Sequence, residues 1–524
     1  MNLLLLLALL LPIPGQSKQA SADEILKHGL ELARLGRVEE AESILDQGRR
    51  AYPADERFLV EMAGLAYRRK DTSLAKQRLR QALRRNPKHR YANDFLAALY
   101  LMERNLPAAL KYWNQIGKPL IQNLHIEPPL NVADILRDRS IMISPGQLLT
   151  LDRLRATESN LDRLGVLSTY QWTLTPQSGD RFDLAFRYLP AEHSSRGWLW
   201  KLAPMLRGLP YQAIHIDRRN IGRRAMDFTS LWRWDPNKRR IAAAFSGFLR
   251  TDPRFKYSLS LDMRDEDWDV TSTYRGQPGG LESLLLRRYE AGVHVDIAVS
   301  EKLSWTTGLQ ITNRRYGQHD GNPVFADGWS FEMPNRLAYE LHRWPERRAR
   351  IDVHAQLTPG RVLTGAPSRF LITEGGLSAA WRPGTNEEGW LLTAHTLAGA
   401  TFGRVLFDQY FQLGMERDND LWLRSRAGAR DGKKGSAPLG TTFTLIQSDF
   451  TYPVFRLPFF TVRTGPFFDV GRISDRSHQF GSQGWLYGTG LQASVTVMRS
   501  LTVRLVYGRD LRNGGDVFYT AVSR

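Results

Sequence analysis

From about residue 210 to the end of the chain, apolar and polar residues alternate. In the clearest stretch, Phe255, Tyr257, Leu259, Leu261 and Met263 alternate with Lys256, Ser258, Ser260, Asp262 and Arg264. The same pattern recurs in residues 293–299, 491–497 and 501–507. A period of two is that of a β-strand, whose successive side chains point to opposite faces. The region divides into about sixteen segments of roughly 20 residues, and it predicts an antiparallel transmembrane β-barrel with lipid outside and a polar lumen.

Residues 24 to about 116 follow a helical pattern with an internal repeat. Small residues recur 34 positions apart in two sets, which are Ala41, Ala75 and Ala109, and, twelve positions earlier, Gly29, Ala63 and Ala97. Pro53 and Pro87 have the same spacing and would end the second helix of a pair. This is the tetratricopeptide period, so the pattern predicts about three helix pairs that pack at these small residues. A chance array of helical hairpins is the alternative. Such repeats either bind a partner's peptide or helix on a concave face or act as spacers.

Between these regions the pattern predicts a small α+β domain. Residues 120–126 alternate as a strand, and Leu148–Leu164 carries a leucine stripe that ends at Gly165. Residues 166–174 and 182–188 then read as two strands joined by a turn. The expected fold class is therefore multidomain, with all-α repeats, an α+β domain and a β-barrel.

The N-terminus has the features of an export signal. An apolar run, Leu3–Ile13, precedes the small residues Ala20-Ser21-Ala22, and a run of this length is too short to span a bilayer. We expect a signal peptide at 1–22, helical repeats at 23–117, the α+β domain at 118–192, a linker at 193–209 and the barrel at 210–524.

Composition narrows the possible functions. The 524 residues include no cysteine, which excludes disulfides, a lipid-anchored cysteine and thiolate metal sites. No apolar stretch reaches the roughly 18 residues of a transmembrane helix. A net charge of +18 favours contact with anionic surfaces such as lipopolysaccharide phosphates and acidic lipids. Nucleic acid is not an expected partner of an exported chain.

Two segments near the C-terminus carry a family resemblance. Gly465-Pro466-Phe467-Phe468-Asp469-Val470-Gly471, after a strand pattern at 458–464, resembles the Phe-x-Asp-x-Gly barrel-wall signature of the BamA/TamA superfamily. Leu421-Trp422-Leu423-Arg424 lies in a long connection, Arg417–Leu439, that resembles the superfamily's sixth extracellular loop, which folds into the lumen. The resemblance implies that Arg424 pairs with Asp469 inside the barrel, beside Phe467 and Gly471.

The resemblance extends over residues 118–524. Residues 161–167, followed by a strand, resemble part of a POTRA module, and residues 210–224 with Trp232–Asp235 resemble the first barrel hairpin. The loop tip departs from the family pattern, because Ser425 stands where glycine is expected and Arg426 where an aromatic residue is expected.

Catalytic interpretations find little support. Residues 428–433 do not have the spacing of a phosphate-binding loop, and Gly488-Thr489-Gly490 lies in an alternating strand rather than before a helix. The acidic run Asp265–Asp269 is interpreted as a solvated loop at a strand end. We expect no enzyme activity, no cofactor and no metal.

The resemblance implies a Gram-negative outer-membrane protein, with its N-terminal domains in the periplasm, that inserts or translocates polypeptides. Its expected partners are outer-membrane lipid, lipopolysaccharide, unfolded or exported polypeptides and a periplasmic protein bound to the repeats. The alternative is an export channel for a surface polysaccharide, since helical repeats joined to a barrel also characterise such exporters. A third possibility is an adhesive or structural surface protein.

Overall fold

The computed structural model describes residues 20–191, 205, 208–275, 283–317, 323–364, 368–384, 389–457, 460–497 and 501–523. The chain divides into two compact units, Met1–Pro119 and Leu120–Arg524. Most of the expected signal peptide, 1–22, and most of the expected linker, 193–209, fall outside the described residues.

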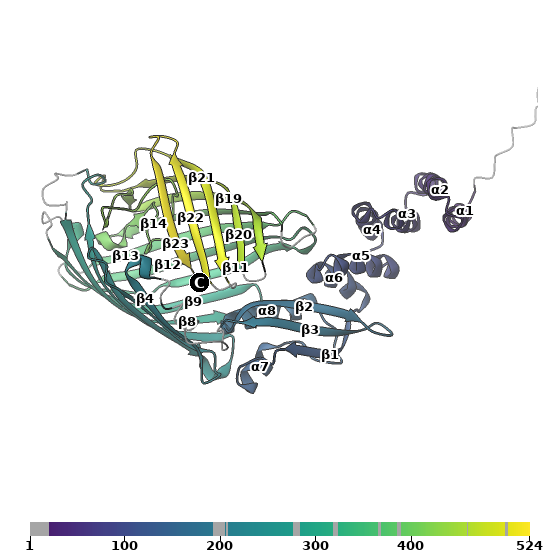
Figure 1. The fold of residues 1–524 in the computed structure, drawn as a ribbon, viewed down its shortest axis with the longest axis horizontal. Coiled ribbons are helices and arrows are strands. Elements are labelled where there is room, and N and C mark those ends of the chain that lie inside the picture. Colours follow the sequence, from purple (N-terminus) through teal and green to yellow (C-terminus); the bar gives the residue numbers. More distant parts are fainter. Residues whose placement is uncertain are drawn as a thin grey trace, which may run out of the picture. The chain divides into compact units, whose positions relative to one another are not determined.

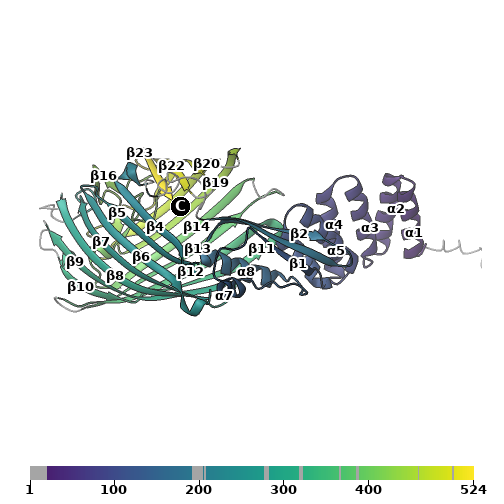
Figure 2. The same cartoon turned by 60° about the horizontal axis from the view of Figure 1, so that its bottom comes forward.

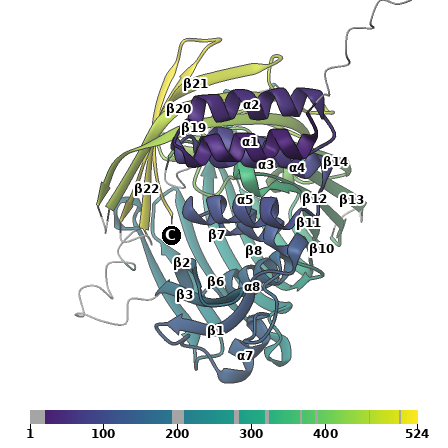
Figure 3. The same ribbon diagram turned by 90° about the vertical axis from the view of Figure 1, so that its right-hand side faces the viewer.

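The first unit is helical. Its elements are α1 (Ala22–Arg34), α2 (Val38–Ala51), α3 (Arg57–Arg68), α4 (Thr72–Arg85), α5 (Arg90–Met102), α6 (Leu106–Trp113) and the short η1 (Asn114–Ile116). The helices contact one another mainly as the pairs α1–α2, α3–α4 and α5–α6, and Figure 3 shows α1 beside α2. The hydroxyl of Ser21 caps the first helix by accepting a hydrogen bond from the Glu24 amide.

The small residues of the 34-residue spacing lie inside this helical unit. All six are buried, and they are Gly29, Ala41, Ala63, Ala75, Ala97 and Ala109. A Cβ atom built on Gly29 would come 2.7 Å from Cδ2 of Leu45, so only glycine permits this approach of α1 to α2. The repeat spacing thus marks the positions where paired helices pack most closely.

The second unit begins with a small α+β domain. Its elements are β1 (Leu120–Glu127), α7 (Asp134–Ser140), α8 (Leu151–Leu164), β2 (Leu167–Pro176) and β3 (Arg181–Pro190). The sheet order is β1-β3-β2, with β1 parallel to β3 and β2 antiparallel to it. The helix α8 ends at Gly165, whose φ of +67° is the left-handed conformation that glycine adopts without strain. The sequence pattern had not indicated α7.

A large antiparallel barrel follows. Its wall strands are β4 (Ala213–Ile221), β5 (Met226–Arg233), β6 (Lys238–Phe248), β7 (Phe255–Trp268), β8 (Leu284–Ala298), β9 (Leu303–Gly317), β10 (Gly328–Glu332), β11 (Asn335–Trp344), β12 (Ala349–Val362), β13 (Ser368–Trp381), β14 (Leu391–Gly403), β19 (Thr442–Leu457), β20 (Phe460–Ser474), β21 (Leu486–Val497), β22 (Leu501–Asp510) and β23 (Asp516–Ser523). Figures 1 and 2 show the two sides of this wall, with β4–β9 in teal and β19–β23 in green to yellow.

The outer face of the wall is apolar. On β7, Leu259, Leu261 and Met263 are 46%, 54% and 46% exposed, whereas the alternate residue Asp262 is only 8% exposed. Residues that pair directly across neighbouring strands share a face, and Leu261 pairs with Ala243 of β6 and Ala291 of β8. The apolar set therefore points away from the lumen and the charged set points into it.

The two rims of the barrel differ. One rim has short turns, such as 222–225, 299–302 and 345–348, while the other has the long connections 269–283, 404–441 and 475–485. The α+β domain contacts the short-turn rim. The Asn220 side-chain amide donates to the Asn131 carbonyl at 2.5 Å, and Arg163 of α8 pairs with Asp296 at 2.5 Å.

The strand order returns from β23 to β4, and this junction is called the seam below. Registers of paired residues join, for example, β4 to β5 and β22 to β23, while β10 and β11 each pair with both β9 and β12. A side-chain contact is also present at the seam, where the hydroxyls of Tyr211 and Thr520 lie 2.7 Å apart.

Among the described residues, no helix is long and apolar enough to cross a membrane.

Candidate functional site inside the barrel

The connection between β14 and β19, residues 404–441, lies against the inner wall and is called the internal loop here. It contains the two-residue strands β15 (Phe411–Gln412), β16 (Ala429–Arg430), β17 (Lys433–Lys434) and β18 (Leu439–Gly440). Its apolar side chains are buried, and they include Phe407, Leu413, Met415, Leu421, Leu423 and Leu439. A loop with this many buried apolar residues is part of the barrel interior rather than a surface connection.

The internal loop places Arg424 against Asp469 of β20. Nη2 and Nε of Arg424 lie 2.5 and 2.9 Å from the two carboxylate oxygens, and the Arg424 amide donates to the same carboxylate at 2.8 Å. Asp469 is fully buried and Arg424 is 3% exposed. Arg424 also pairs with Asp449 of β19. The planar guanidinium thus makes a two-pronged, charge-assisted contact that a lysine would not reproduce.

The residues of the Phe-x-Asp-x-Gly segment share the inward face of β20. Phe467 is buried, and its ring lies 4.0 Å from the Arg424 guanidinium carbon, in cation–π geometry. A Cβ atom on Gly471 would lie 3.1 Å from a methyl carbon of Leu413, so this glycine makes room for the internal loop. The segment lies within β20, which continues to Ser474, and the expectation that it follows a strand ending at Thr464 was wrong.

The barrel wall accommodates the unusual loop tip. Ser425 is buried, and a Cβ atom on Gly488 of β21 would come 2.3 Å from its hydroxyl oxygen. A Cβ atom on Gly508 of β22 would come 2.0 Å from the Arg424 carbonyl oxygen. Arg426 forms an ion pair with Asp510 at the end of β22. Glycines in the wall, rather than in the loop, therefore provide the close approach.

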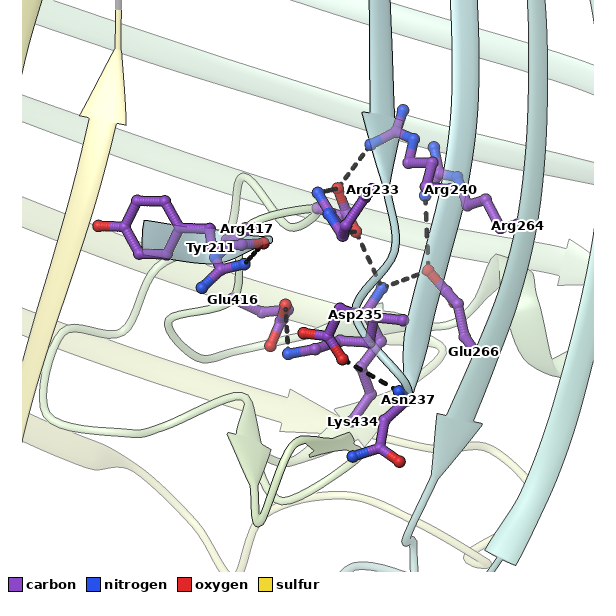
Figure 4. A network of polar contacts seen from close by, with 12 residues as sticks. Tyr211, Arg233, Asp235, Asn237, Arg240, Arg264, Glu266, Glu416, Arg417 and Lys434 are labelled. Carbon is purple, nitrogen blue, oxygen red and sulfur yellow. Dashed lines mark hydrogen bonds and ion pairs between the residues drawn. The ribbon is translucent and has the colours of Figure 1, made fainter. Parts of the chain in front are cut away.

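A second group of charges, which sequence reasoning missed, lies on the opposite side of the internal loop. Asp418 accepts hydrogen bonds from Arg233 of β5 at 2.7 Å and from Arg240 of β6 at 2.5 Å. Glu416 pairs with Lys238 at 3.4 Å, and Figure 4 shows this network. No local motif announces these contacts, because they join residues about 180 positions apart.

The acidic run at residues 265–269 is not a solvated loop. Residues Asp265–Trp268 belong to β7, and Glu266 is only 5% exposed. Its carboxylate lies 2.7 Å from Nζ of Lys434, which the returning half of the internal loop brings to β7 (Figure 4). The expectation failed because the inward alternation of β7 continues through the acidic run.

A further anchor lies near the start of the internal loop. Asp408 forms an ion pair with Arg314 of β9, whose Nε lies 2.8 Å from the carboxylate, and it accepts a hydrogen bond from the hydroxyl of Tyr316 of β9 at 3.0 Å. Gln409 donates to Glu332 of β10 at 2.9 Å. Across the described part of the chain, no group of three or more His, Asp or Glu side chains is arranged to hold a metal ion.

Fold and site together define a helical region followed by a large antiparallel β-barrel with an ion-paired internal loop. No protein-family model and no curated protein matches the sequence. Similar solved structures include BamA from Haemophilus ducreyi lacking POTRA domains 1–3, with 14% identity, a TM-score of 0.44, and coverage of 77% of this chain and 84% of that chain.

Two further similar structures are CdiB proteins. CdiB from Escherichia coli has 14% identity, a TM-score of 0.49, and coverage of 78% of this chain and 75% of that chain. CdiB from Acinetobacter baumannii has 11% identity, a TM-score of 0.42, and coverage of 78% and 74%.

Proposed function

We propose that this protein inserts or translocates polypeptides at the outer membrane of a Gram-negative bacterium, in the manner of the BamA/TamA superfamily. The observation that carries the proposal is the buried contact between Arg424 and Asp469, which holds the internal loop inside the lumen. The family resemblance of the two segments implied this pairing.

The apolar outer face supports a membrane location. Large exposed side chains such as Leu259, Leu261 and Leu309 belong to a continuous apolar surface, which water would strongly disfavour and lipid would solvate. Short turns are typical of the periplasmic rim of such barrels. Because the α+β domain contacts the short-turn rim, we place it in the periplasm together with the helical unit.

In this proposal the wall has about sixteen strands, residues 23–117 are tetratricopeptide-like repeats and residues 118–192 are a POTRA-like domain. The two N-terminal domains receive the polypeptide or a periplasmic partner. The seam then opens, and the freed edges of β4 and β23 offer backbone groups for pairing with an incoming strand. The chemistry is non-covalent, so no enzyme activity and no cofactor are needed.

The alternative is a passive export channel for an anionic surface polysaccharide. A channel of this kind requires an open lumen, and the buried packing of the internal loop favours a lumen that is occupied instead. The two functions also differ in their cargo, which makes them separable in the cell.

The test is depletion of the protein, followed by quantitative outer-membrane proteomics and a surface-polysaccharide assay. Wild-type protein and an Arg424→Ala variant are then expressed in the depleted cells. We expect specific barrel or secreted proteins to be lost with polysaccharide intact, and we expect the variant to restore them poorly. Loss of polysaccharide with an unchanged proteome would overturn the proposal in favour of the exporter. Altered surface adhesion alone would point to the adhesive protein.

A further inference from the structure

Residues 416–426 of the internal loop carry buried acidic side chains towards one end and basic side chains at the other, while Arg417 and Asp420 are exposed. The acidic group consists of the ion-paired Glu416 and Asp418, and the basic group consists of the ion-paired Arg424 and Arg426. Side chains of Glu416 and Asp418 are each 2% exposed, and that of Arg424 is 4% exposed. Charges this deeply buried are tolerated only when each has a partner.

The two groups bind opposite sides of the seam. The acidic group pairs with Arg233 of β5 and with Lys238 and Arg240 of β6, and both strands follow β4. Figure 4 shows Arg233, Arg240 and Glu416 of this group. The basic group pairs with Asp449 of β19, Asp469 of β20 and Asp510 of β22. These three strands lie on the β23 side of the seam.

The same segment also contacts residues at the seam itself. The Arg417 guanidinium carbon lies 3.9 Å from the ring centre of Tyr211, which precedes β4, and Arg417 also donates to the Tyr211 carbonyl at 3.3 Å (Figure 4). The Trp422 ring lies 5.5 Å from the ring of Tyr519 on β23. One short segment, 416–426, therefore contacts both sides of the junction.

We propose that residues 416–426 form an electrostatic strap that holds the two sides of the seam together and limits their separation. The order of the charges fixes the direction of the strap, because its acidic end would be repelled by Asp449, Asp469 and Asp510, and its basic end by the cations of β5 and β6. Neutralising either end leaves buried partners unpaired and detaches that end. The barrel then separates more easily at the seam.

The strap rests on the proposed function only in that opening of the seam would admit the substrate, so its test needs no substrate. The chain contains no cysteine, which allows spin labels at single introduced cysteines. Ile216 of β4 and Phe518 of β23 are suitable sites, since both are exposed on the outer face. Distance distributions between them are measured by double electron–electron resonance on the full chain in lipid nanodiscs.

The comparison uses four further proteins. Asp418→Asn and Arg424→Gln each disable one end of the strap, while Asp418→Glu keeps the charge. Asp352→Asn is the matched control, because Asp352 pairs with Arg350 in a more exposed position on β12. A second label pair at Leu357 and Leu377 reports whether the opposite wall remains folded, as both side chains are exposed on the outer face.

We expect a single narrow distribution across the seam for the wild type, Asp418→Glu and Asp352→Asn. Asp418→Asn and Arg424→Gln should each add a longer-distance population, with the distribution at Leu357 and Leu377 unchanged. Narrow seam distributions in both disabled variants would overturn the strap even if the protein still inserts polypeptides. A seam that opens as expected without any effect on polypeptide levels would instead contradict the proposed function.

Discussion

The guanidinium of Arg424 and the carboxylate of Asp469 meet inside the barrel, 45 residues apart in sequence and 2.5 Å apart at their closest atoms. Both side chains are almost completely shielded from solvent. The pair fixes the internal loop to the middle of the barrel wall. Without it, this loop would be free to extend away from the barrel.

Breaking this pair on one side should release the internal loop. For Asp469→Asn we expect the free energy of unfolding to fall by about 3–5 kcal/mol, because Arg424 would remain buried with one carboxylate fewer. Hydrogen exchange of residues 413–428 measures the release as faster exchange. Asp352→Asn should leave exchange unchanged, and equal exchange in Asp469→Asn and the wild type would show that the pair does not hold the loop.

Glycines in the wall should control how closely the loop tip docks. Gly508→Ala would place a methyl group 2.0 Å from the Arg424 carbonyl oxygen, so either the tip or β22 must shift. We expect a lower melting temperature and faster exchange at the tip, consistent with overpacking costs of about 1–3 kcal/mol. Gly515→Ala is the control, since a Cβ atom there meets nothing within 4 Å. Identical behaviour of the two variants would contradict the docking geometry.

The domain beside the barrel should depend on pH through Glu158. Burial, which is the main cause, and nearby Asp162 raise the pKa of Glu158 from 4.5 to about 7, although Arg343 opposes the shift. A carboxyl whose pKa is higher in the folded state stabilises that state fully below about pH 4.5, and the contribution declines as the pH rises towards 7. We expect Glu158→Gln to protect α8 from hydrogen exchange at pH 8 by up to ~3 kcal/mol and to have little effect at pH 4. Equal protection of α8 in the variant and the wild type at pH 8 would show that Glu158 does not cause the pH dependence of this domain's stability.

The helical unit should be sensitive to size at its small residues. Ala75 is fully buried, so Ala75→Leu should overpack α3 and α4 and lower stability by about 1–3 kcal/mol. Ala51 lies exposed at the end of α2, and Ala51→Leu should change stability by less than about 0.5 kcal/mol. Thermal unfolding followed by circular dichroism at the helical band compares the two. A larger loss at Ala51 would contradict the packing of the repeats.

Sequence patterns predicted the barrel and helices because each reflects a local period. Leu259, Leu261 and Met263 alternate with charged or hydroxyl residues because one face meets an apolar environment and the other the lumen. The 34-residue spacing was visible because close helix contacts require small side chains at every repeat. The short helix α7 has too few turns to show a period, and it was missed.

The candidate site was only half visible in the sequence. Arg424 and Asp469 stand in segments with a family resemblance, so their contact was expected. Asp418 and Glu266 carry no such signal, since their burial depends on Arg233 and Lys434, which arrive from distant parts of the chain. Charged residues that look solvated in a sequence can therefore form the interior of a barrel when both signs converge.

The most direct test of the account asks what touches the seam in living cells. A photo-crosslinking amino acid replaces Phe518 on β23, which is 66% exposed, or Leu377 on β13, which is 42% exposed and serves as the control. After irradiation, crosslinked partners are identified by mass spectrometry. The account predicts discrete outer-membrane or secreted polypeptides captured from position 518 and not from 377. Absence of polypeptide adducts at 518, or the same adducts at both positions, would contradict it.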